Sequence, residues 1–232
     1  GWYDVNQSTS VVSDYVWDLV EGRSRRQLTA WQLDGGEKIS ISRSESGSFA
    51  TPTVKMDINR TLTFFDVNQY YLTVSSEQGD PKGAGWYDKG STVEFSVTTP
   101  WSTQKGERNL VTGYVGDATG EGSSGTIIMD SPKKVAFNWN KQYFLLVGNG
   151  GHGSVSGTGW YDRGSFATIS ITGSPESGGP GVRHVFDHWA GIGPSSVQSS
   201  ERVLTLTMNS PVNQTAIWRN QFLISFKFTD KE

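Results

Sequence analysis

The motif Gly-Trp-Tyr-Asp occurs three times in this chain of 232 residues, at positions 1–4, 85–88 and 159–162. Successive motifs, which begin at Gly1, Gly85 and Gly159, are therefore separated by intervals of similar length. Four consecutive identities that include a Trp are too specific to arise from composition alone, and self-similarity at such a spacing indicates a repeat protein. The chain is expected to fold as nearly three copies of one module of about 75 residues.

Further landmarks recur in the same order and fix the register of the repeat. Each repeat has an Arg six residues before an aromatic residue, then a Met, then a Gln-aromatic pair at a constant distance after the Met. The Arg and aromatic residues are Arg25 and Trp31, Arg108 and Tyr114, and Arg183 and Trp189. The Met residues and the pairs are Met56 with Gln69-Tyr70, Met129 with Gln142-Tyr143, and Met208 with Gln221-Phe222. This register predicts modules at 1–68 (repeat 1), 69–141 (repeat 2) and 142–220 (repeat 3), followed by an orphan strand within 221–232.

Alternation of apolar and polar residues predicts β-strands in every repeat. In repeat 2 the clearest runs are residues 70–75 and a run with Val93, Phe95 and Val97 on one face, and further strands are expected near 108–114, 127–129 and 135–139. The 28 Gly residues and the 12% aromatic content are typical of short strands joined by tight turns. No stretch has a convincing helical period. The expected fold is all-β, a tandem array of small β-sandwich-like modules of about 75 residues.

The order of these motifs resembles the divergent internalin-type B-repeat, a small β module strung in tandem in bacterial and archaeal surface proteins. Repeat 3 matches best, through Gly159, Trp160, Tyr161, Asp162, Gly164, Ser165, Arg183, Phe186, Trp189, Gly191, Met208, Ser210, Pro211 and Trp218. Repeat 2 departs at Leu110 and Tyr114, and repeat 1 departs most, at Val5, Asp57-Ile58 and Asp66. The resemblance covers essentially the whole chain. It implies display outside the cell, adhesion or assembly, and it transfers no catalytic residues.

Charge and composition exclude several classes of partner. The net charge of −3 leaves no basic face to offset phosphates, so no nucleic-acid partner is expected. The longest apolar runs fall far short of the ~20 residues that cross a bilayer, so no membrane span is expected. The chain has no Cys, and the fold is therefore expected to lack disulfides and thiolate metal sites.

Three Asn-x-Ser/Thr sequons make Asn6, Asn59 and Asn213 candidate glycosylation acceptors. The chain begins at Gly1 rather than Met, which fits either removal of a leader or a segment of a longer protein. Together with the resemblance, these features predict an extracellular or cell-surface location, with surface glycans as candidate partners.

The repeated landmarks favour structural roles, because repeated apolar positions normally line cores. In repeat 3 the expected core aromatics are Trp160, Phe186, Trp189 and Trp218. The motif residues Asp4, Asp88 and Asp162 are interpreted as turn formers whose carboxylates accept backbone N–H bonds. Calcium ligation is the alternative, but the regular acidic spacing of known calcium loops is missing. The repeated Arg is expected to pair with a carboxylate or stack on an aromatic ring.

No enzyme is predicted, and no cofactor or metal is expected. The three His residues are His152, His184 and His188. On a regular strand His184 and His188 share a face with Phe186, but they lie too far apart for one metal ion unless the strand bends. No Gly-x-Ser-x-Gly elbow occurs, and the Gly-rich stretch 148–153 lacks the Lys and helix of a phosphate loop.

The two ends of the repeat array are complementary. Repeat 1 lacks the Gln-aromatic strand with which repeats 2 and 3 begin, and a surplus strand of this kind starts at Gln221. Its apolar face comprises Phe222, Ile224, Phe226 and Phe228, and an unpaired strand of this type is prone to aggregate. Donor-strand complementation is therefore predicted, in which the C-terminal strand of one molecule fills the open groove of the next and builds a head-to-tail homopolymer. The alternatives are a window of a longer array and, less favoured for three modules in a row, closure within one chain.

The leading functional expectation is a structural subunit of an extracellular filament or surface layer. The alternative is an adhesive or carbohydrate-binding repeat segment of a larger cell-surface protein. An exposed row formed by Trp17, Trp31 and Trp101 would favour the alternative, because flat indole rings are platforms for sugars. The polar residues 229–232 resemble a chain ending and slightly favour the filament.

Overall fold

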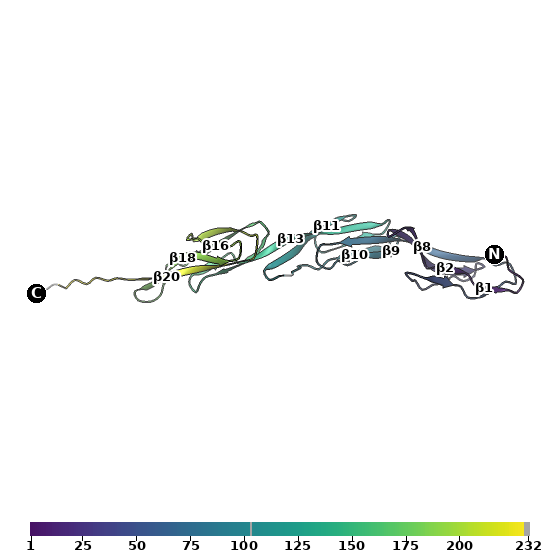
Figure 1. The fold of residues 1–232 in the computed structure, drawn as a ribbon, viewed down its shortest axis with the longest axis horizontal. Coiled ribbons are helices and arrows are strands. Elements are labelled where there is room, and N and C mark those ends of the chain that lie inside the picture. Colours follow the sequence, from purple (N-terminus) through teal and green to yellow (C-terminus); the bar gives the residue numbers. More distant parts are fainter. Residues whose placement is uncertain (103, 230–232) are drawn as a thin grey trace. The chain divides into compact units, whose positions relative to one another are not determined.

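The computed structural model describes residues 1–102 and 104–229. Within these residues all regular structure consists of strands, which confirms the all-β prediction (Figure 1). No described segment forms a helix long and apolar enough to span a membrane. The chain divides into two compact units, unit 1 with residues 1–98 and 113–138 and unit 2 with residues 99–112 and 139–232. Residues 230–232, at the end of the expected orphan strand, lie outside the described residues.

Most strands lie entirely within one or the other of the two units. Those of unit 1 are β1 (Ser8–Thr9), β2 (Val12–Asp14), β3 (Val16–Val20), β4 (Ser24–Leu33), β5 (Ile39–Ser40), β6 (Ser48–Ala50), β7 (Val54–Lys55), β8 (Leu62–Ser75), β9 (Gly85–Asp88), β10 (Thr92–Ser96) and β12 (Ser124–Ile128). Those of unit 2 are β14 (Ser154–Ser156), β15 (Gly159–Asp162), β16 (Phe166–Thr172), β17 (Glu176–Ser177), β18 (Val182–Ile192), β19 (Val203–Thr207) and β20 (Val212–Phe222). The long strands β11 (Glu107–Gly116) and β13 (Lys133–Gly148) have residues in both units.

The last strand of one repeat and the Gln-aromatic strand of the next form one continuous strand. This is a correction to the expectation of separate strands, and it holds for β8 and for β13. No Gly or Pro interrupts the sequence at either connection, so the extended backbone continues without a turn. The strand β20 likewise runs on as far as Gln221 and Phe222.

Each continuous strand pairs in the same way. The start of β8 is antiparallel to β4, its middle is antiparallel to β9, and residues 72–75 run parallel to residues 133–136 of β13. In β13 the middle is antiparallel to β15, and residues 145–148 run parallel to residues 212–215 of β20. The sequence repeat is therefore also a repeat of strand register.

A β-bulge in β4 and another in β18, the strands that carry Arg25 and Arg183, explain an unusual spacing of buried residues in the sequence. Leu28 and Trp31 are both buried although they are three residues apart, and the same holds for Phe186 and Trp189. A regular strand would place residues three apart on opposite faces. The register shifts between Leu28 and Ala30, and again after Phe186, so that both side chains of each pair reach the core.

The bulge in β18 also overturns the expectation that His184 and His188 share a face. The shift lies between Phe186 and His188, so the side chain of His188 changes sides.

The core of unit 2 lies between two sheets, one formed by β13, β20 and β18 and the other by β14, β16 and β19. Trp189 is completely buried and Phe186 nearly so, as expected, whereas Trp160 and Trp218 are only half-buried. The core residues are Tyr143, Leu145, Val147, Ala167, Ile169, Ile171, Phe186, Trp189, Leu206, Met208, Val212 and Ala216.

Aromatic residues pack together in both of the repeats that contribute to unit 1. Within repeat 2, the rings of Phe95, Tyr114 and Phe137 meet edge to face, with centroids 4.9 to 6.0 Å apart. Within repeat 1, the buried residues Leu28, Trp31 and Ile41 are surrounded by half-buried Tyr15, Trp17, Leu33, Phe49, Leu62 and Phe64. Edge-to-face contacts add to the apolar burial on which small cores depend.

Replacing Trp189 by Ala is expected to lower the free energy of unfolding by about 3–5 kcal/mol, because the fully buried indole would leave a cavity. Urea denaturation followed by circular dichroism measures the change. The control is Ile192→Ala on the same strand, whose side chain is 76% exposed, with an expected change within about 0.5 kcal/mol. Equal losses in both variants would contradict this account of the core.

Candidate assembly site

The repeated Arg and the repeated Gln form the same hydrogen bond three times. In each case the Arg Nε donates to the Gln Oε1 over 2.8 Å, between Arg25 and Gln69, Arg108 and Gln142, and Arg183 and Gln221. The backbone around each pair is also alike. The N–H two residues after the Gln donates to the carbonyl two residues before the Arg, in the pairs Tyr71 and Arg23, Phe144 and Gly106, and Leu223 and Gly181. The three Arg-Gln sites therefore share the same side-chain and backbone hydrogen bonds.

The next Gly-Trp-Tyr-Asp motif completes the first two sites. Gln69 Nε2 donates to Asp88 Oδ1 over 2.8 Å, and Gln142 Nε2 donates to Asp162 Oδ1 over 2.7 Å. The guanidinium carbon of Arg25 lies 4.4 Å from the ring centroid of Trp86, and Arg108 lies 4.4 Å from that of Trp160. The guanidinium of each Arg thus lies over the ring of a Trp from the following repeat, which is a favourable cation–π geometry.

The strand register places these groups together. In the first site Gln69 is opposite Asp88 and Tyr71 is opposite Trp86, whose rings meet edge to face at 5.3 Å. In the second site Gln142 is opposite Asp162, and Phe144 is opposite Trp160 at 5.1 Å. The residue two positions after each Gln therefore packs against the docked indole.

The first site is the most enclosed. Arg25 is only 4% exposed, and its Nη1 also contacts Glu45 Oε2 at 2.6 Å. The hydrogen bond from Arg25 lowers the pKa of Glu45 below its ordinary value. Asp88 additionally receives two hydrogen bonds from the Arg43 guanidinium, at 2.8 and 2.7 Å. These bonds, with that from Gln69, lower the pKa of Asp88.

The motif Asp does not act as expected in the turn. The carboxylates of Asp88 and Asp162 bind Gln side chains, while their backbone carbonyls accept from the amide and hydroxyl of Ser91 and Ser165. The carboxylate of Asp88 is fully engaged by Arg43 and Gln69, which disfavours the calcium alternative there. The described residues contain no group of three His, Asp or Glu side chains arranged to hold a metal ion.

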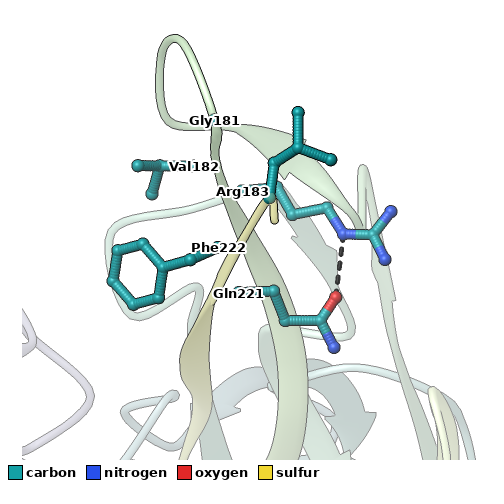
Figure 2. A pocket seen from close by; sticks show the side chains of 6 residues that line it. Gly181, Val182, Arg183, Gln221 and Phe222 are labelled. Carbon is teal, nitrogen blue, oxygen red and sulfur yellow. Dashed lines mark hydrogen bonds between the residues drawn. The ribbon is translucent and has the colours of Figure 1, made fainter. Parts of the chain in front are cut away.

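The third site is open. Figure 2 shows Arg183 and Gln221 joined by their hydrogen bond, with Val182 and Phe222 pointing to the other side of the strands. An open hollow of about 600 Å³ lies here, lined by Gly181, Val182, Arg183, Gln221, Phe222 and Leu223. Arg183 is exposed, and among the described residues no group accepts a hydrogen bond from Gln221 Nε2. The Trp and Asp that complete the other two sites have no counterpart at this one in the part of the chain described.

The Gly-Trp-Tyr-Asp motif at residues 1–4 lacks the partners that the other two motifs have among the described residues. The side chain of Trp2 is 103% exposed and that of Tyr3 43% exposed, whereas Trp86 and Trp160 are half-buried. The turn that follows the motif is nevertheless formed. The N–H of Asn6 donates to the carbonyl of Met56, as Gly90 does to Met129 and Gly164 does to Met208. The partners of this motif, a Gln-aromatic strand and an Arg, are missing from the described residues.

A hollow in unit 1 lies beside the first motif. It has a volume of about 170 Å³ and is lined by Gly1, Tyr3, Thr9, Val11, Leu33, Val54, Met56, Arg60 and Leu62. In repeat 2 the fully buried Leu72 pairs with Gly85 and Lys133, and in repeat 3 Leu145 pairs with Gly159 and Val212. The corresponding positions in repeat 1 are Gly1 and Arg60, and both line the hollow.

The predicted donor residues are exposed. Phe222 ends β20, and the following residues, Leu223 to Thr229, form no strand in the structure and extend beyond β20 in Figure 1. The exposed fractions of Phe222, Ile224, Phe226 and Phe228 are 72%, 74%, 84% and 93%. Counting from the Gln, Ile224 corresponds to Leu72 and Leu145, which are completely buried. This segment therefore exposes, in Ile224, an apolar side chain at the position that is buried in the two earlier repeats.

Other predicted residues are also located. The sequon residues Asn6, Asn59 and Asn213 are all exposed. Trp17 and Trp101 are half-buried and Trp31 is 6% exposed, so the three do not form an exposed row.

The three His residues each have a hydrogen-bonding partner. His188 Nδ1 lies 2.8 Å from Asp187, His184 Nδ1 lies 2.8 Å from Asn220, and His152 Nδ1 lies 3.1 Å from Glu176. The ring of His184 stacks on that of His152, with centroids 3.8 Å apart, a pairing that the sequence reasoning did not identify.

Stacking of the repeated Arg on an aromatic ring was expected from the sequence and occurs at Trp86 and Trp160. The link of the repeated Gln to the Arg and to the motif Asp was missed by sequence reasoning. Its signal was present, because a Gln that recurs at a constant spacing has no role in an apolar core. Such a polar residue requires a partner when it is buried, and the other recurring polar landmarks are the Arg and the Asp.

Gln69→Leu is expected to reduce the free energy of unfolding by about 2–4 kcal/mol, because it leaves the buried Arg25 without its main neutral partner. Gln198→Leu, at an exposed position, should change the free energy by no more than about 0.5 kcal/mol. Urea denaturation measures both, and a Gln69 variant as stable as the control would contradict the role of this bond.

The lowered pKa of Asp88 predicts an acid dependence. The ionised carboxylate is preferred in the folded state, so its stabilisation is complete above the unfolded pKa of about 3.9 and is lost as the pH falls through the lower folded value. The difference in stability between the natural chain and Asp88→Asn should therefore be present at pH 7 and shrink below about pH 4. Denaturation midpoints at a series of pH values test this, and a constant difference would contradict it.

Comparisons with known proteins add no assignment: no family model matches the sequence, and neither the curated proteins nor the solved structures contain a significant match. The functional argument therefore rests on the repeated geometry of the Arg-Gln sites and on the two open ends of that repeat.

Proposed function

We propose that the chain is a structural subunit of an extracellular filament or surface layer, in which residues 221–228 of one molecule complete repeat 1 of the next. The proposal treats each repeat as one small β-sandwich-like module. Recurrence of the parallel strand pairing and of the turn bonded to each Met supports that treatment.

One observation carries the proposal. Ile224 and Phe226 are 74% and 84% exposed, whereas Leu72 and Leu145, at the position of Ile224 in the earlier repeats, are completely buried. Leaving this many large apolar side chains in water is unfavourable, by about 1.5–3 kcal/mol for each. A hollow in repeat 1, with the counterparts of the residues that flank Leu72 and Leu145, offers the complementary surface.

The resemblance to internalin-type B-repeats supports an extracellular or cell-surface location, as do the three exposed sequons. Asn6, Asn59 and Asn213 would carry the glycans in that setting. The polymer would grow by one contact repeated from molecule to molecule, which does not close on itself. No catalytic step and no cofactor enter the proposal.

The adhesive or carbohydrate-binding alternative receives less support. Trp31 is enclosed in a core, and the face of Trp160 is occupied by Arg108. These indoles are therefore not free platforms for a sugar ring.

Phe226→Asp is expected to weaken self-association by about 100-fold or more, because it would bury an unpaired carboxylate in the groove. Ser225→Asp adds the same charge on the opposite face of the segment and should leave association within about threefold of the natural chain. Sedimentation velocity across a concentration series gives the association constants, and electron microscopy identifies filaments.

Equal association of the two variants and the natural chain would refute donor-strand complementation. So would a natural chain that remains monomeric over the whole concentration series.

A further inference from the structure

We propose that the Arg183–Gln221 site is the specific docking site for the Gly-Trp-Tyr-Asp motif at residues 1–4 of a second molecule of this chain. The inference rests on the proposed head-to-tail assembly and identifies the contact that selects the partner and its register. It adds polar contacts to the apolar strand exchange described above.

The register follows from the two completed sites. In both of them the Gln is opposite the motif Asp, and the next three residues are opposite Tyr, Trp and Gly in turn. Applied to the open site, this places Gln221 opposite Asp4, Phe222 opposite Tyr3, Leu223 opposite Trp2 and Ile224 opposite Gly1. The strands would run antiparallel, as β8 and β9 do.

The contacts follow from the same templates. Trp2 would lie beneath the guanidinium of Arg183, as Trp86 lies beneath Arg25. Leu223 would pack against this indole, in the place of Tyr71 and Phe144. Asp4 would accept a hydrogen bond from Gln221 Nε2, which has no acceptor among the described residues. The hollow of about 600 Å³ is where the indole would enter.

The Arg183–Gln221 site and the motif at residues 1–4 are both already in the conformation that this contact uses. The bond between Arg183 and Gln221 has the same length, 2.8 Å, as in the completed sites, so the open site needs no rearrangement of this pair. The turn after the first motif is anchored to Met56. Preformed surfaces lose less freedom on association, which favours binding.

The polarity of the templates indicates a second molecule as the occupant. Arg25 does not use the motif of its own repeat, at residues 1–4, but that of the following repeat, at 85–88, and Arg108 uses the motif at 159–162. The motif at 1–4 therefore has no Arg partner among the described residues, and Arg183 has no motif. A head-to-tail contact between molecules joins the two.

The test compares self-association of the full chain with that of Trp2→Ala, Arg183→Ala and the double variant. Because the side chain of Trp2 makes no contact that the fold needs, its loss should leave thermal unfolding unchanged. Each single substitution should weaken association by about tenfold or more, and the double variant should be little weaker than the stronger single one, since both remove one contact. Phe166→Ala, an exposed aromatic residue (74%) elsewhere on the surface, is the matched control and should associate like the natural chain.

The outcomes separate this inference from the proposed assembly. If Phe226→Asp blocks association while Trp2→Ala and Arg183→Ala have no effect, strand exchange stands and the docking site is refuted. If the effects of the two single variants simply add, Arg183 and Trp2 do not meet and the site is also refuted. If association does not depend on concentration, or is absent, both the intermolecular site and the assembly are wrong.

Discussion

The structure depends on an arginine that each repeat cannot satisfy by itself. Arg25 is buried; its Nε donates to Gln69, its Nη1 contacts Glu45, its guanidinium lies over the ring of Trp86, and its Nη2 has no hydrogen-bond partner among the described residues. Trp86, and the Asp88 that holds Gln69, belong to the next repeat. Burying a cation without such partners costs several kcal/mol, so the burial of Arg25 depends on the docked motif, whereas Arg183, which has no docked motif among the described residues, stays exposed. At the two completed sites, the Arg and the Gln are thereby energetically coupled to the Gly-Trp-Tyr-Asp motif that follows them.

The continuous strands also connect neighbouring repeats to one another. Because β8 and β13 each end one repeat and begin the next, the hydrogen bonds of neighbouring repeats are made along the same backbone. The chain has no Cys, so no disulfide adds to these strand pairings. The strand β20 continues the pattern with Gln221 and Phe222, where it presents the same edge without a successor in the described residues.

The all-β class, the repeat register and the apolar strand faces could be predicted from sequence, because alternation and identity at a fixed spacing are local signals. The buried face of Val93, Phe95 and Val97 is an example. The bulges and the stacking of His152 on His184 could not, because they depend on strand pairing over long distances in the chain. The spacing of three between Leu28 and Trp31 contained a hint of the bulge. The Arg-Gln-Asp link escaped prediction because its members lie 19 to 44 residues apart and come from different repeats.

Disulfide trapping between molecules tests the central claim most directly, because the chain has no Cys of its own. Phe222→Cys and Tyr3→Cys chains, each with a single Cys, would be mixed and oxidised, and the mixed dimer quantified by mass. The account predicts efficient crosslinking of this pair, whose members the register places opposite one another, and little crosslinking when Tyr3→Cys is mixed with Lys227→Cys, which lies outside residues 221–224, the part of the segment that pairs with the motif. Equal yields from the two mixtures, or no mixed dimer in either, would contradict it.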